Sequence, residues 1–72
     1  MSKTLEELGY EKEENRFYII FRKQHKEIVF DKVDREVFGE TIINEEFKLI
    51  RTCFSMEELK AIYKWCEDNK WI

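Results

Sequence analysis

The chain of 72 residues contains no proline and only two glycines. Without proline-rich, glycine-rich or serine-rich stretches, it has no sequence typical of an interdomain linker, so residues 1–72 are predicted to form one small domain. The longest uninterrupted apolar run is the five residues Phe17–Phe21, whereas a membrane helix needs roughly 20. The acidic N-terminus also lacks the apolar segment of a signal peptide. We therefore expect a cytoplasmic protein without membrane association.

Cysteine and histidine are scarce, and their spacing does not suit a metal site. His25, Cys53 and Cys66 are separated by 28 and 13 positions, with no Cys-x-x-Cys pair. Structural zinc sites use four ligands at close paired spacings, and disulfides are rare in reducing compartments. We expect no metal, no cofactor and two free thiols. Cys66 is predicted to pack in the core, while Cys53, just before a helix, is the alternative candidate for a reactive thiol.

The sequence predicts no catalytic residues and no enzyme activity. General acid–base catalysis needs a carboxyl group desolvated in a cleft. The chain has no glycine-rich loop with which to build such a cleft. Its paired glutamates suit helix caps, turns and solvated faces instead, at positions 6–7, 13–14, 45–46 and 57–58.

Aromatic residues and charge are abundant. Eleven residues are Phe, Tyr or Trp, a content that favours a folded core over disorder. Residues 1–15 hold five Glu against two Lys, whereas residues 16–72 are balanced at eleven acids and eleven bases. Because nucleic-acid affinity comes mainly from Lys and Arg on phosphates, this balance disfavours nucleic acid as a partner.

Three segments rich in β-branched and aromatic residues are predicted as strands: Arg16–Arg22, Glu27–Asp31 and Glu36–Ile43. Polar residues 11–15 are interpreted as a connection, and residues 23–26 and 32–35 as turns. Gly39 indicates a bulge in the third strand. Phe47–Cys53 is predicted as a fourth strand, with one helical turn as the alternative.

Alternation within the first strand places apolar side chains on both of its faces. Phe17, Ile19 and Phe21 share one face. The other face carries Tyr18 and Ile20, together with Val29 of the second predicted strand. This second face is covered only if the N-terminal segment reaches it with its own apolar side chains, Leu5, Leu8 and Tyr10.

The C-terminal segment predicts an amphipathic helix. Ser55 is its N-cap and Glu58 completes a capping box, with Phe54 facing Leu59 as a hydrophobic staple. Asn69 is expected to end the helix in a left-handed conformation. The predicted apolar stripe consists of Leu59, Ile62, Tyr63 and Cys66, with Ala61 and Trp65 on its flanks.

The N-terminus repeats the capping pattern, since Thr4-Leu-Glu-Glu-Leu8 matches Ser55-Met-Glu-Glu-Leu59. Gly9 follows at once, so at most a turn or two of helix is expected there. Together these elements predict an α+β fold. It is an antiparallel three- to four-stranded β-meander with one C-terminal α-helix packed on one face and a short helical turn at the N-terminus.

The segments Thr4–Tyr10, Phe17–Phe21 and Phe54–Ile62, and the ending Trp71-Ile72, carry a resemblance. In them the chain resembles small uncharacterised proteins encoded in prophages of Gram-positive bacteria. The resemblance implies a phage-associated setting in the bacterial cytoplasm. It implies no activity and transfers no catalytic residue.

With no chemistry indicated, binding is the favoured function. Trp65, Trp71 and Tyr18 are the candidate anchors of a small protein-interaction module, because exposed Trp and Tyr are common interface anchors. The acidic residues 1–15 would favour a basic partner. The partner is expected to be an unidentified protein or a second copy of the chain.

Two alternatives remain from the sequence. The first is a nucleic-acid-binding domain that uses the basic hairpin turn at residues 22–26, through Arg22, Lys23, His25 and Lys26, with aromatic side chains nearby for base stacking. The same charges are also typical of a solvated turn that protects a strand from aggregation. The second alternative is a structural protein that self-assembles by pairing exposed strand edges.

Overall fold

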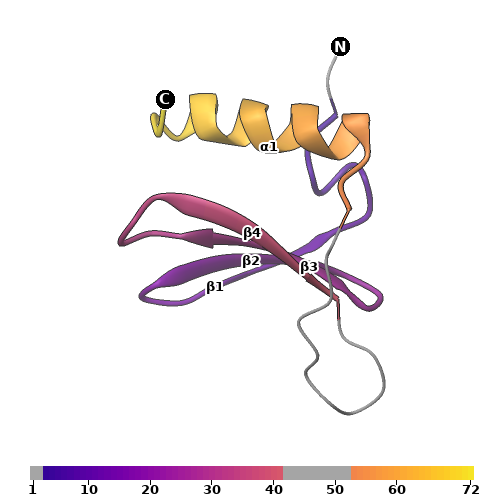
Figure 1. The fold of residues 1–72 in the computed structure, drawn as a ribbon, viewed down its shortest axis with the longest axis horizontal. Helices are drawn as coiled ribbons and strands as arrows, with labels where there is room; N and C mark the ends of the chain where they lie inside the picture. The colour runs from indigo at the N-terminus through magenta and orange to yellow at the C-terminus, as the bar shows by residue number, and fades with distance from the viewer. Residues whose placement is uncertain (1–2, 42–52) are drawn as a thin grey trace.

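The computed structural model describes residues 3–41 and 53–72, which form a four-stranded antiparallel sheet and one helix (Figure 1). The strands lie in sequence order, each paired with the next. The helix lies over one face of the sheet. The elements are β1 (Glu11–Glu14), β2 (Tyr18–Lys23), β3 (Lys26–Asp31), β4 (Glu36–Thr41) and α1 (Met56–Asp68). The predicted α+β meander with a C-terminal helix is therefore confirmed.

Strand β1 corrects the interpretation of residues 11–15 as a connection. All four residues of β1 are exposed, so apolar alternation gives no sign of a strand there. It pairs with β2 through its backbone. The Asn15 side chain accepts hydrogen bonds from the amides of Phe17 and Tyr18, at 2.9 and 2.8 Å, and so forms the turn between the two strands. As a result β2 begins at Tyr18 and not at Arg16, and Phe17 lies exposed in the turn.

The β2–β3 and β3–β4 turns join strands that pair without interruption. The predicted four-residue connection at 23–26 is shorter than expected, because Lys23 pairs with Lys26 across the two residues Gln24 and His25. The turn at 32–35 is confirmed. Gly39 pairs directly with Ile28 in an unbroken ladder, so the predicted bulge is wrong. Within the described residues β4 ends at Thr41; the expected continuation to Ile43 and most of the expected strand 47–53 lie outside the described residues.

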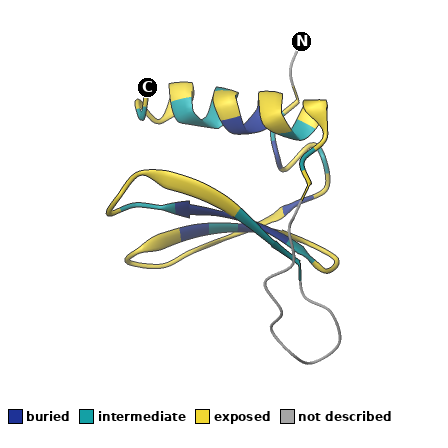
Figure 2. Cartoon of the chain, in the orientation of Figure 1, coloured by how far each residue is buried: buried dark blue, intermediate teal, exposed yellow. Residues whose placement is uncertain are grey.

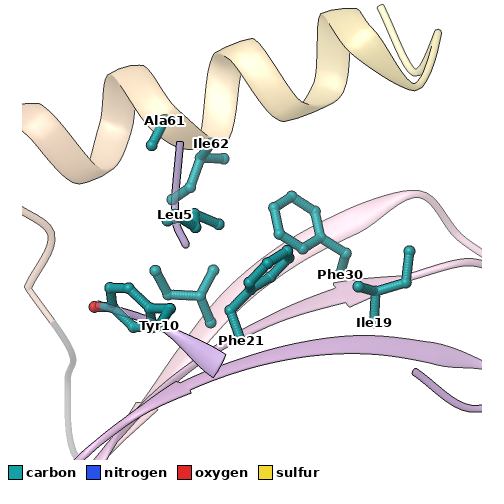
Figure 3. Close-up of a cluster of buried hydrophobic side chains, with 8 residues drawn as sticks. Leu5, Tyr10, Ile19, Phe21, Phe30, Ala61 and Ile62 are labelled. Atoms are coloured by element: carbon teal, nitrogen blue, oxygen red, sulfur yellow. The ribbon is translucent and has the colours of Figure 1, made fainter. Parts of the chain in front are cut away.

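The core lies between the helix and the sheet (Figure 3). Ile19 and Phe21 of β2 and Phe30 of β3 point towards α1 (Figure 3), and Ile28 of β3 belongs to the same cluster. The ribbon coloured by burial shows buried segments on both β2 and α1 (Figure 2). The N-terminal segment adds Leu5 and Tyr10 to this same cluster. It therefore does not cover the opposite face of the sheet.

Three aromatic rings fix the helix on the sheet. The Trp65 ring stacks on Phe30, with centroids 4.0 Å apart and planes inclined by 29°. Trp71 meets both rings edge-on, at 5.9 Å from Phe30 and 4.9 Å from Trp65. We call these three residues the aromatic cluster. Their arrangement satisfies the offset and edge-to-face geometries that aromatic pairs prefer.

The helix faces the sheet with a different stripe from the one predicted. Ala61 and Ile62 are its buried residues, with Trp65 and Cys66 partly buried against the core. Leu59 and Tyr63 are 43% and 60% exposed. Trp65 is the bulkiest apolar side chain on α1, and its contact with Phe30 defines which side of the helix is turned inwards.

The start of α1 is as predicted, and its end differs by one residue. The Ser55 hydroxyl accepts from the Glu58 amide at 3.1 Å, and the Glu58 carboxylate accepts from the Ser55 amide at 2.8 Å. At the other end Lys70, not Asn69, adopts the left-handed conformation, with φ of 59°. The Trp71 amide then donates to the Cys66 carbonyl and the Lys70 amide to the Glu67 carbonyl, the Schellman arrangement. This turn directs Trp71 back onto the core.

The N-terminal segment forms a hydrogen-bonded turn over residues 5–9, and the predicted helical turn is not seen there as a helix. Its capping pairs are nevertheless present, since Thr4 and Glu7 exchange two hydrogen bonds of 3.1 Å. Gly9 has φ of 99°, the positive value expected for a glycine at this position.

The left-handed residue at the helix end generates a stability prediction. Replacing Lys70 by glycine removes the steric cost of a positive φ and should raise the free energy of unfolding by about 0.5–1 kcal/mol in urea denaturation. The matched control Lys60→Gly, in the exposed helix interior, should lower it by about 1 kcal/mol. Destabilisation by Lys70→Gly would contradict the Schellman ending.

The aromatic cluster generates a second prediction. Trp71→Ala should lower the free energy of unfolding by about 2 kcal/mol, somewhat less than the 3–5 kcal/mol typical of a fully buried tryptophan. Tyr63→Ala on the exposed side of α1 is the control and should change it by less than about 0.5 kcal/mol. Equal effects of the two substitutions would show that Trp71 does not hold the helix in place.

Candidate functional site

The face of the sheet turned away from α1, which we call the outer face, carries apolar side chains. The ladder pairs Ile20 with Val29 and Val29 with Phe38, so these three residues form one row across β2, β3 and β4. Tyr18 lies on the same face, two residues before Ile20. The row is separate from the core between sheet and helix, because Val29 is buried yet absent from the core cluster.

The row is accessible at its margins. Tyr18 and Phe38 are 39% and 37% exposed, Ile20 is partly buried, and Val29 is buried between its two neighbours. No helix or strand among residues 3–41 and 53–72 packs over this face (Figure 1). An antiparallel sheet usually turns polar side chains to solvent on its uncovered side. Apolar residues here are therefore candidates for a binding surface.

Acidic side chains surround the row. By register and alternation, the described strands place six acids and one base on the outer face: Glu11, Glu13, Glu27, Asp31, Glu36 and Glu40 against Arg22. The single base is already occupied. Arg22 donates to the buried Glu27 at 2.7 Å and lies 3.4 Å from Glu13, and the hydrogen bond to Glu27 raises the pKa of the guanidinium. The face thus keeps a net negative charge.

The remaining acids of this face differ in their surroundings. Asp31 accepts hydrogen bonds from the amides of Val33 and Asp34, at 2.8 and 3.2 Å, and holds the β3–β4 turn. In the part of the chain that the structure describes, Glu11, Glu36 and Glu40 form no ion pair. These three carboxylates are open to a cationic partner.

The basic cluster predicted at residues 22–26 does not form one patch. Arg22 points to the outer face, whereas Lys23 and Lys26 point to the side of the helix. Lys23 donates to the Leu8 carbonyl at 2.8 Å. His25 lies exposed in the turn. The cluster is split between two faces and partly neutralised, which weakens the support for nucleic-acid binding.

Lys26 belongs to a polar network that joins three segments of the chain. It donates to Glu58 at 2.8 Å and to the Cys53 carbonyl at 2.6 Å, and the Tyr10 hydroxyl also donates to Glu58. The network lies beside an open groove of about 670 Å³ between the N-terminal turn, the β2–β3 hairpin and the start of α1. Its charged groups are bonded to one another, so the network holds these segments together.

This network shifts the pKa values of its members. Burial raises the pKa of Glu58, but hydrogen bonds from Lys26, the Ser55 amide and Tyr10 outweigh it and lower the pKa to about 2. Burial and the hydrogen bond to Glu58 raise the pKa of Tyr10. Glu58 is therefore ionised at neutral pH, where it accepts from all three donors.

The predicted protein-binding residues occupy two different environments. Trp65 and Trp71 are partly buried in the aromatic cluster, which gives both a structural role. Tyr18 is exposed on the outer face, as predicted. Binding through the two tryptophans stays a prediction, and the structure does not bring them together with Tyr18, because they lie on opposite sides of the sheet.

Phe38 is the apolar member of the outer face that the sequence did not identify. It follows Val37, and two adjacent apolar residues do not reveal which one faces the core. The pairing of β4 with β3 decides this, since Phe38 is opposite Val29 and Val37 opposite Phe30. The length of the 32–35 turn could have indicated which of the two faces outwards, because turn length sets the register of a hairpin.

The cysteines and the helix offer no further site. Both thiols are free, with Cys53 exposed and Cys66 partly buried. Burial raises the pKa of Cys66 and so lowers its thiolate content. The described residues contain no group of three or more His, Cys, Asp or Glu placed to hold a metal ion. In the same residues, no helix has the length and apolar character needed to cross a membrane.

The low pKa of Glu58 predicts an acid-sensitive fold. Its folded pKa of about 2 is below the ordinary value of 4.5, so its contribution is present above pH 4.5 and is lost as the pH falls towards 2. Because the side chain is near the surface, we expect a loss of about 1–3 kcal/mol in the free energy of unfolding over this range.

Urea denaturation of wild type, Glu58→Gln and Glu57→Gln between neutral pH and pH 2 measures this loss. The Glu58→Gln variant should be less stable at neutral pH and should lose less stability on acidification. Glu57→Gln is the neighbouring control and should follow wild type. Parallel pH profiles for wild type and Glu58→Gln would exclude the network as the cause.

Comparisons with protein families, with curated proteins and with solved structures find no match to this chain. The resemblance to prophage proteins therefore stays an expectation. The geometry and charge of the outer face are the features that bear on function.

Proposed function

We propose that the protein is a non-catalytic interaction module that binds a basic protein partner through the outer face of its sheet. The observation that carries the proposal is the apolar row Ile20–Val29–Phe38, which no described element covers. Tyr18 extends this row with a partly exposed aromatic ring. An apolar patch with polar residues around it is typical of a protein interface, and exposed aromatic side chains are frequent binding hot spots.

The charge of the outer face supports a basic partner. Two of the five glutamates in residues 1–15, Glu11 and Glu13, lie on this face beside the apolar row. Complementary charge speeds association and suppresses the wrong partners. Their position supports the predicted preference of the acidic N-terminal residues for a basic partner.

The groups elsewhere in the molecule support binding without catalysis. Two of the charged residues that line the groove beside the start of α1, Lys26 and Glu58, are engaged with each other. Two free thiols suit the reducing cytoplasm, where we place the protein. Trp65 and Trp71 contribute by holding α1 against the opposite face of the sheet.

A displayed library of random peptides, selected on the immobilised protein, tests the proposal. Selected peptides should bind wild type and should lose at least about tenfold in affinity, or about 1.4 kcal/mol, on Tyr18→Ser and Phe38→Ser. They should also be enriched in Lys and Arg. The loss follows from removal of the aromatic anchors, since the charges of the face are unchanged.

Tyr63→Ser is the matched control, because Tyr63 is an exposed aromatic residue on the helix. It should leave peptide binding within about twofold of wild type. Thermal unfolding of each variant establishes that the fold is retained. Selected peptides that bind Tyr18→Ser and Phe38→Ser as tightly as wild type would refute the outer face as the binding site.

A further inference from the structure

We infer, as an extension that rests on the proposed function, that the outer face takes a short basic amphipathic helix lying across the strands. The observation is the order of the rows on this face. The apolar row Ile20–Val29–Phe38 runs perpendicular to the strands and has acidic residues on both of its sides.

On one side lies the row formed by Glu11, Arg22, Glu27 and Glu40. On the other lies the row formed by Tyr18, Asp31 and Glu36. Glu13 ends the apolar row on β1. A ligand that fills this surface therefore needs an apolar stripe with cationic side chains on both flanks, which is the pattern of an amphipathic basic helix.

The spacing of the rows fits the diameter of a helix. Alternate residues along a strand are about 7 Å apart, so the two acidic rows are separated by about 14 Å. A helix with its side chains is about 10–12 Å wide. Lysine or arginine side chains on its two flanks would thus reach one acidic row each while its apolar stripe covers the central row.

The width of the sheet sets the length of the contact. Four strands at about 4.8 Å spacing give a row about 14 Å long. At 1.5 Å per residue this corresponds to about ten helical residues, or two to three turns. A short helical segment of a larger partner is sufficient to cover the face.

A strand and a second copy of the chain fit this surface less well. An added strand pairs with the backbone at a sheet edge and does not read a row that runs across the face. A second copy would bring two acidic faces together, because each carries six acids and one base on its described strands, and like charges across an interface are unfavourable.

Two synthetic peptides of equal Leu and Lys composition test the inference. In the first, Leu recurs with the helical period, and in the second, Leu and Lys alternate with the period of a strand. Fluorescence anisotropy measures their affinity for the intact protein, and amide chemical shifts of the labelled protein locate the contact. Circular dichroism reports the conformation of the bound peptide.

The helical-period peptide should bind at least about tenfold more tightly than the alternating peptide and should gain helix on binding. Its affinity should fall as salt is raised, because exposed charges are screened. The largest shift changes should map to residues of the outer face, with little change on α1.

Charge reversal supplies the matched variants. Glu36→Lys combined with Glu40→Lys reverses one acid in each flanking row and should weaken the helical-period peptide by at least about tenfold. Glu67→Lys combined with Glu57→Lys makes the same charge change on exposed positions of α1. This control should weaken binding by less than about threefold, through net charge alone.

The outcomes separate this inference from the proposed function. Equal binding of the two Leu-Lys peptides, or tighter binding of the alternating one, overturns the helical partner, while library peptides that require Tyr18 and Phe38 still support the function. Sedimentation that shows a dimer of the protein alone, abolished by Phe38→Ser, assigns the face to a second copy and also overturns the inference. If neither the selected library peptides nor the Leu-Lys peptides bind at the outer face, the proposed function itself is refuted.

Discussion

The stacking of Trp65 on Phe30 is the contact on which the arrangement of helix and sheet depends. It joins the end of β3 to the last turn of α1, and the Schellman turn at Lys70 returns Trp71 to the same ring. A chain of this length can build only a small core, so a few large rings provide much of the apolar contact. With Trp65 turned inwards, Ala61 and Ile62 also face the sheet, while Leu59 and Tyr63 are left towards solvent.

This packing assigns different roles to the two faces of the sheet. The helix and the N-terminal segment both cover the face that carries Phe21 and Phe30. Strand alternation then leaves Ile20, Val29 and Phe38 on the outer face, with acidic residues on both sides of them. The outer face combines apolar contact area with net negative charge, and the proposed binding of a basic partner follows from that combination.

The Tyr10–Glu58–Lys26 network complements the aromatic cluster at the opposite end of the helix. It links the segment before β1, the start of β3 and the first turn of α1 through one partly buried carboxylate. The same carboxylate completes the capping box of α1. Local capping and long-range attachment therefore depend on one residue.

Features that depend only on neighbours along the chain could be predicted from the sequence. These are the start of the helix at Ser55, the strands rich in β-branched and aromatic residues, the positive φ of Gly9 and the α+β class. Hydrogen bonds and side-chain periodicity within a few residues decide them. The remaining features depend on contacts between residues distant in the sequence, so they could not be predicted from local patterns. Polar β1 becomes a strand by pairing with β2, and contact with Phe30 turns Trp65 inwards. Pairing with β3 places Phe38 beside Val29 on the outer face.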